Sequence, residues 1–171
     1  MSSNLKNSKL LRRSLIVGAA MLLAGCQARP LYLDEAGETR ASLGAIAFSE
    51  AKTRVGLETR NRLIFLAGGG AQPKTPEYRV DLTVTSSVQG VLLDRAADRP
   101  NSGRALAVGD FKLTRISDGV VMKTARRQTV ALFDYPRQEY ARLRSVRDAE
   151  TRAGRELAEL IYADLATALA R

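Results

Sequence analysis

The sequence of 171 residues contains no histidine, no tryptophan and only one cysteine. A Ser-His-Asp triad and histidine-containing zinc sites are therefore excluded, and an intrachain disulfide cannot form. Metal ligands would have to be carboxylates, and no carboxylate cluster is present, so we expect no metal and no cofactor. Serine and aspartate remain without an activating partner, which argues against a periplasmic hydrolase and predicts a non-enzyme. A hydrophobic content of 45% suits one globular domain.

Long hydrophobic runs are also missing, and the most apolar stretch lies near the start of the chain. Residues 1–25 carry four basic side chains and no acidic one, and their apolar run extends only from Leu15 to Ala24. A helix that spans a bilayer needs roughly twenty apolar residues. A basic segment followed by a short apolar one instead predicts a secretory signal peptide over residues 1–25 that is removed.

The end of this leader, Leu23-Ala24-Gly25-Cys26, has the form of a bacterial lipobox. In such a site the Cys26 thiolate accepts diacylglycerol, and its amino group accepts a further acyl chain such as palmitate after cleavage. Gln27 follows where an inner-membrane retention signal would place Asp, so we expect an outer-membrane anchor facing the periplasm. Two or three acyl chains are enough for stable anchoring. The alternative is that Cys26 is an unmodified, buried thiol in a plain signal peptide or in a failed membrane helix.

The basic charge is confined to one segment. The formal charge of +9 falls to +5 without the leader, because 23 basic residues then face 18 acidic ones. Residues 26–94, 128–137 and 138–171 are each balanced, so the whole excess lies in residues 95–127. Such a segment predicts an anionic partner, and for a periplasmic protein phosphorylated lipid is more plausible than nucleic acid. A solvated strand surface is the alternative. The candidate phosphate contacts are Arg104, Lys112, Arg115, Lys123, Arg126 and Arg127.

The first half of the chain predicts a tether, a strand and a helix. Residues 26–42 look like an acylated tether, and residues 43–171 like a single periplasmic domain. The domain begins with a short strand over 43–48 and a helix over about 50–66, with Ser49 as its N-cap. The Gly68-Gly69-Gly70 triplet then ends the helix; it lacks the setting of a phosphate-binding loop.

The second half predicts three strands and a long helix. Alternation predicts a strand over 78–93, interrupted at Gly90, and a turn over 98–103 leads to a second strand over 104–116. A bulge near Gly109 and Asp110 would bring Leu106, Val108, Phe111 and Leu113 to one face. A turn at 117–119 leads to a strand over 120–133, in which Arg126 and Arg127 must point to opposite faces. Apolar residues at helical spacing predict a helix over 137–169.

These elements together predict an α+β domain. Its small sheet, mainly antiparallel or mixed, should have about four strands, with two helices packed on one face.

Several short motifs resemble one family. Gly-Cys-Gln-Ala-Arg-Pro-Leu-Tyr at 25–32 resembles the start of lipopolysaccharide (LPS) assembly lipoproteins of the LptE family, in which Pro-Leu-Tyr follows the lipidated cysteine. Residues 60–63, 78–82, 138–141 and 147–150 are similar to its alphaproteobacterial branch.

The resemblance implies a non-enzymatic lipoprotein that plugs the large β-barrel protein LptD at a ratio of one to one. It would assist folding of the barrel and passage of LPS to the outer leaflet. Two alternatives stay open: an accessory lipoprotein of an ABC-type envelope lipid transporter, and a structural lipoprotein that links the outer membrane to the cell wall.

Overall fold

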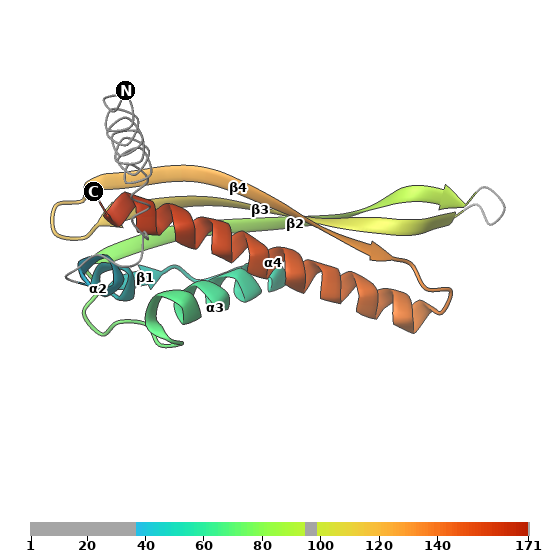
Figure 1. The fold of residues 1–171 in the computed structure, drawn as a ribbon, viewed down its shortest axis with the longest axis horizontal. Coiled ribbons are helices and arrows are strands. Elements are labelled where there is room, and N and C mark those ends of the chain that lie inside the picture. Colours follow the sequence, from blue (N-terminus) through green and yellow to red (C-terminus); the bar gives the residue numbers. More distant parts are fainter. Residues whose placement is uncertain (1–36, 95–98, 171) are drawn as a thin grey trace, which may run out of the picture.

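The computed structural model describes residues 37–94 and 99–170 (Figure 1). The predicted signal peptide, Cys26 and most of the predicted tether lie outside these residues. The helices and strands, in chain order, are α2 (Glu38–Gly44), β1 (Ile46–Phe48), α3 (Arg54–Gly68), β2 (Tyr78–Asp94), β3 (Arg99–Arg115), β4 (Val121–Asp134) and α4 (Glu139–Leu169).

The strands form one mixed sheet with the order β1-β2-β3-β4. The short β1 pairs in parallel with Tyr78–Val80 of β2, while the β2–β3 and β3–β4 pairs are antiparallel. The distal part of the β2–β3 hairpin projects beyond the helices and gives the molecule an elongated outline (Figure 1). The predicted α+β class and the four-stranded mixed sheet are confirmed.

The core lies between the sheet and the helices. Alternation along the strands directs Val80, Phe111 and Leu113 toward the helices, and these side chains are at most 2% exposed. Leu157, Ile161 and Leu165 of α4 cover them and are fully buried. The spacing of these residues at steps of four explains why α4 packs along one stripe, as predicted.

The predicted tether and first helix need correction. Residues 38–42 belong to α2, in which Thr39 and Leu43 share a face and are buried, so Leu43 does not open a strand. Ser49 does not cap a helix, because its hydroxyl accepts a hydrogen bond from the Leu82 N–H and extends the pairing with β2. Thr53 is the N-cap instead, with its hydroxyl accepting from the Gly56 N–H at 3.0 Å.

The second strand also differs from its prediction. The proposed turn over 98–103 is wrong because β3 already begins at Arg99. The bulge near Gly109 and Asp110 is wrong too, since both residues keep regular partners on β2 and β4. The register is irregular only beyond Gly90 of β2 and at the end of the β3–β4 ladder. Ala105, Ala107 and Gly109 therefore face the helices, which places the larger Leu106 and Val108 on the opposite face.

The two long helices meet at a glycine. A Cβ atom on Gly154 of α4 would lie 3.2 Å from Thr59 Oγ1, Val55 Cγ1 and the Val55 carbonyl oxygen of α3. The Thr59 hydroxyl donates to the carbonyl oxygens of Val55 at 2.9 Å and of Gly154 at 3.1 Å. The absence of a side chain at position 154 therefore sets the distance between α3 and α4.

Substituting Gly154→Val should destabilise the domain by about 1–3 kcal/mol, because the added methyl groups meet backbone and a buried threonine that cannot move away. The matched control is Gly68→Val at the end of α3, where an added Cβ meets nothing within 4 Å. Urea unfolding of both variants measures the difference. Equal midpoints would show that the helices separate without cost.

Candidate functional site

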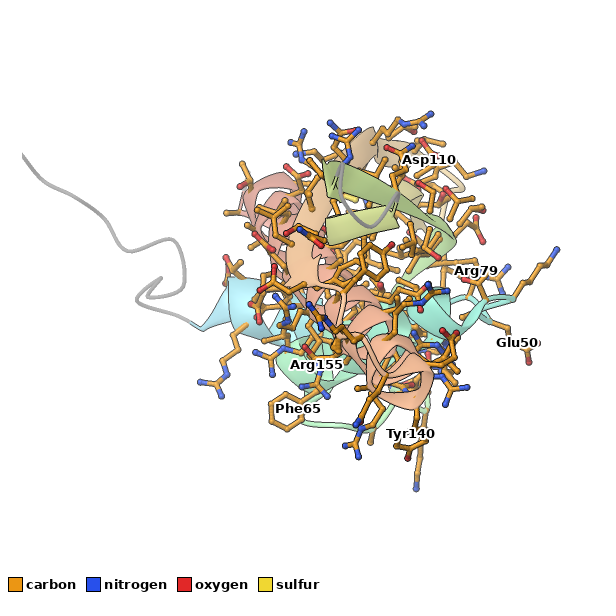
Figure 2. The ribbon with its side chains drawn as sticks, turned by 90° about the vertical axis from the view of Figure 1, so that its right-hand side faces the viewer. Glu50, Phe65, Arg79, Asp110, Tyr140 and Arg155 are labelled. Carbon is orange, nitrogen blue, oxygen red and sulfur yellow. The ribbon has the colours of Figure 1, made fainter. Side chains whose placement is uncertain are left out.

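One face of the sheet carries three of the six candidate cations. We call the side opposite α3 and α4 the open face; it is formed by the odd-numbered residues of β2 and the even-numbered residues of β3 and β4. Arg104 and Lys112 of β3 and Arg126 of β4 lie there. Figure 2 shows Asp110 of this face on the opposite side of the molecule from Arg155 of α4 and Phe65 of α3.

The cations of the open face are loosely held. Lys112 Nζ lies 3.9 Å from Asp81 Oδ2, and Arg126 Nη1 lies 3.8 Å from Asp110 Oδ1, with all four side chains about half exposed or more. Arg104 donates two hydrogen bonds to the neutral Gln89 Oε1, at 2.7 and 3.1 Å. Exposed pairs of this kind contribute little stability. These cations can therefore turn toward an external anion, and guanidinium groups bind phosphate through two parallel hydrogen bonds.

The same face carries an apolar band made of Leu106, Val130 and Leu132, while the neighbouring Val108 is buried. Leu106 of β3 lies directly opposite Val130 of β4, and Leu132 lies opposite Arg104. Val130 is 45% exposed and Leu132 is 66% exposed. Apolar groups beside cations suit a lipid that carries phosphate. The sequence did not predict this band, because the expected bulge placed Leu106 on the helix side. Alternation along β4 does place Val130 and Leu132 on the same face as Arg126.

Two other candidate cations lie on the helix side, where they hold α4. Lys123 Nζ lies 3.0 Å from Asp164 Oδ1, and Arg127 donates to the same carboxylate at 2.7 and 2.9 Å. The Asp164 side chain is only 12% exposed. Burial raises its pKa, but the hydrogen bonds from Arg127 and Lys123 outweigh this effect and leave the pKa below its ordinary value. Arg126 and Arg127 thus point to opposite faces, as alternation predicts.

The sixth candidate, Arg115, belongs to the β3–β4 turn. Its guanidinium lies 2.9 Å from Asp118, whose other carboxylate oxygen accepts from the Val120 N–H at 3.1 Å. The backbone hydrogen bond from Val120 and the contact with Arg115 lower the pKa of Asp118. The basic segment therefore does not form one cationic face, because its six candidates divide among the open face, α4 and a turn.

The described ranges, 37–94 and 99–170, contain neither a metal site nor a membrane-spanning helix. No group of three or more cysteine, aspartate or glutamate side chains is placed there to hold a metal ion. No helix of this part of the chain is long and apolar enough to cross a membrane.

Comparisons with known proteins place the fold. No known family and no curated protein matches the sequence. The structure is similar to that of a candidate lipoprotein from Caulobacter crescentus CB15, with 28% identity, a TM-score of 0.63 and coverage of 77% of this chain and 95% of the other. Rare lipoprotein B from Shewanella oneidensis has a similar fold, with 12% identity, a TM-score of 0.52 and coverage of 71% and 93%. The chain therefore has the fold of bacterial lipoproteins, which supports a lipoprotein role.

Substituting Asp164→Asn should destabilise the domain by about 1–2 kcal/mol, because Lys123 and Arg127 lose their shared counter-charge. Since the folded pKa of Asp164 lies below its ordinary value of 3.8, the carboxylate stabilises the fold fully above about pH 4 and less as the pH falls through the folded pKa. The difference in stability between the Asp164→Asn variant and the wild-type protein should therefore become smaller only at acidic pH.

Thermal unfolding at several pH values measures this effect. The control is Asp148→Asn, which removes an exposed pair with Arg152 on the same helix and should change little. A pH-independent difference for Asp164→Asn would contradict the electrostatic role.

Proposed function

We propose that the protein is an outer-membrane lipoprotein, anchored through acyl chains on Cys26, that partners the LPS-translocating β-barrel LptD at one to one. The observation that carries the proposal is the pairing of a lipobox at residues 23–26 with a domain that has the fold of bacterial lipoproteins. Acylation would hold the domain at the periplasmic surface of the outer membrane. The Pro-Leu-Tyr that follows Cys26 supports the LptE resemblance within this group of proteins.

The shape and packing suit a protein that plugs a barrel and assists its assembly. The long strands β2, β3 and β4 make up most of the sheet, and α3 and α4 cover it from one side (Figure 1). The largest core side chains, among them Phe111, Leu157 and Ile161, are nearly or fully buried. A close-packed body of this kind keeps its shape against a partner because interiors resist compression.

The open face supplies a means of assisting LPS passage. Arg104, Lys112 and Arg126 would compete for lipid A phosphates that divalent cations otherwise bridge, because guanidinium groups form charge-assisted hydrogen bonds to phosphate. The adjacent apolar band would contact acyl chains. Lys123 and Arg127 contribute less to such contacts, since Asp164 already occupies both.

Charge reversal on the open face tests LPS binding. A soluble form without residues 1–26 that carries Arg104→Glu, Lys112→Glu and Arg126→Glu should bind purified LPS at least about tenfold more weakly, since three phosphate contacts become repulsive. The control reverses Arg40, Arg137 and Arg144, which are exposed, lie outside β2, β3 and β4, and change the net charge equally. Equal LPS binding by both triple variants would sink the idea.

Co-purification tests the partner. The acylated protein, extracted from envelopes with detergent, should retain an equimolar large β-barrel protein, and Cys26→Ser should abolish its membrane association because the anchor is lost. Protein quantification of the eluate measures the ratio. Recovery of transporter ATPase or permease subunits in place of a barrel would favour the ABC-type alternative.

A further inference from the structure

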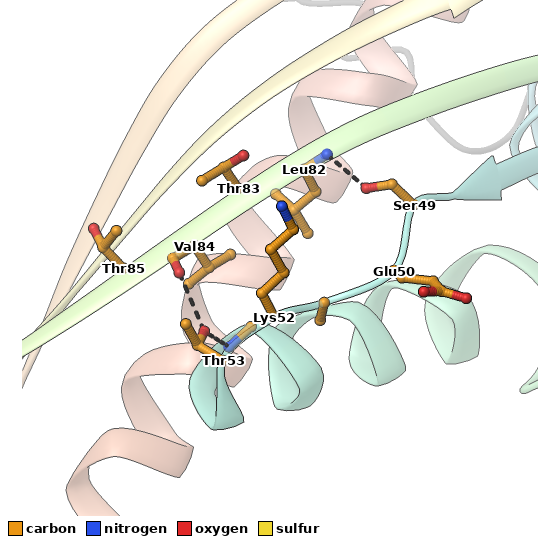
Figure 3. Close-up of a pocket in the computed structure, with 10 residues that line it drawn as sticks. Ser49, Glu50, Lys52, Thr53, Leu82, Thr83, Val84 and Thr85 are labelled. Atoms are coloured by element: carbon orange, nitrogen blue, oxygen red, sulfur yellow. Dashed lines mark hydrogen bonds between the residues drawn. The ribbon is translucent and has the colours of Figure 1, made fainter.

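The outer edge of β2 is covered over only half its length. β1 pairs with Tyr78–Val80, and the segment after β1 then follows the edge for a short distance (Figure 3). The Ser49 N–H donates to the Val80 carbonyl oxygen at 3.0 Å, and the Thr53 hydroxyl donates to the Val84 carbonyl oxygen at 3.1 Å. The chain turns into α3 at Thr53 and leaves the edge.

Beyond Val84 the edge is open. The even-numbered residues of β2 direct their backbone groups toward β1, as Val80 and Val84 show, so Ser86, Val88 and Gly90 present N–H and C=O groups outward. Within the described part of the chain, no residue hydrogen-bonds to these groups on that side. Ser86, Val88 and Gly90 are all exposed. An added strand could therefore form hydrogen bonds with these N–H and C=O groups.

The two edges of the sheet differ in their protection. The twelve residues from Leu82 to Leu93 include no charged side chain, although charged residues make up 26% of the sequence. The opposite edge, β4, carries Lys123, Arg126 and Arg127, and Arg152 donates to its outward Leu132 carbonyl oxygen at 3.0 Å. Charged side chains on an edge oppose pairing with another strand. The uncovered part of the β2 edge lacks this protection, whereas on the short β1 the Phe48 N–H already donates to the Gln72 side chain at 3.0 Å.

A pocket of about 240 Å³ lies where the covered part of the edge ends, lined among others by Ala51, Thr53, Gly56, Leu82 and Val84 (Figure 3). Glu50 and Lys52, from the segment between β1 and α3, also line it (Figure 3). In strand addition, main-chain hydrogen bonds give affinity and pockets beside the edge accept alternate side chains. A lipid acyl chain is a poorer occupant because it would leave the backbone groups of β2 desolvated and unpaired.

We propose that residues Ser86–Gly90 of β2 accept an extended, uncharged segment of the partner barrel protein as an additional strand, with one apolar side chain of that segment in the pocket. The inference rests on the proposed function and identifies the surface through which the partner is held. A second copy of this chain is a less suitable occupant, because each copy without the leader still carries a formal charge of +5 and the copies repel.

The test compares proline on the two edges of the acylated full-length protein. Ser86→Pro removes an outward N–H and places a ring in the path of the added strand, but it leaves the β2–β3 ladder intact because position 86 does not donate to β3. Gln128→Pro makes the same change on the outer edge of β4. Ser86→Pro should reduce the amount of barrel protein retained on co-purification by about tenfold. This factor corresponds to about 1.4 kcal/mol, which is the size of one lost hydrogen bond. Gln128→Pro should reduce the retained amount by less than about twofold.

Thermal unfolding checks that both variants fold; if either does not, Ser86→Lys and Gln128→Lys replace them, since a lysine also opposes strand addition. Equal retention by the two variants would overturn the edge proposal while the partnership stands. A wild-type protein that retains no barrel would overturn both proposals. A homodimer that Ser86→Pro dissociates would assign the edge to a second copy and overturn the barrel segment as its occupant.

Discussion

The close approach of α4 to both the sheet and α3 is the constraint on which the rest of the structure depends. A Cβ on Gly109 of β3 would lie 3.2 Å from Leu157 and Ile161, and one on Gly154 would lie 3.2 Å from α3. Two consecutive α4 carbonyl oxygens, those of Ala153 and Gly154, accept buried threonine hydroxyls from Thr129 of β4 and Thr59 of α3. One helix is thus hydrogen-bonded on both sides, and neither threonine is left unpaired in the core.

This packing determines which basic residues remain available. Because side chains alternate along β4, the position of α4 decides that Arg127 and Lys123 bind Asp164 while Arg126 faces away from the helices. The helix-covered face is filled with small and apolar residues. Cations and exposed apolar side chains then share the open face, where the loosely paired Asp81 of β2 and Asp110 of β3 provide counter-charge.

The sequence predicted the helices and strands that have strong periodicity, but it did not predict which side of each strand packs against the helices. The long α4 and the alternation of β2 follow from spacing alone. The side of β3 that meets the helices could not be predicted, because size suggested Leu106 and Val108 while the close approach of α4 selects Ala105, Ala107 and Gly109. The N-cap of α3 was missed for a related reason: Ser49 has the right chemistry for a cap, but its hydroxyl is used by β2.

The sequence identified the basic residues of the candidate site but did not predict how they are arranged in the structure. Six cations were identified from a local charge excess, yet a linear count of charge contains no information on the distant Asp164 that binds two of them. Alternation did separate Arg126 from Arg127 correctly. The apolar band required the register of β3 against β4, which is a non-local property.

The exposed surfaces are small, and the proposed lipid anchor would allow such small surfaces to bind a partner. Leu132 is 66% exposed, and the free part of the β2 edge offers backbone groups of only three residues. Neither surface alone supplies the area of a tight complex between freely diffusing proteins. The proposed acylation of Cys26 would place the protein in the same membrane plane as its proposed partner, and such confinement would raise the effective concentration and favour binding without new contacts. The uncovered edge of β2 and the apolar band are therefore compatible with specific binding of a partner at the membrane.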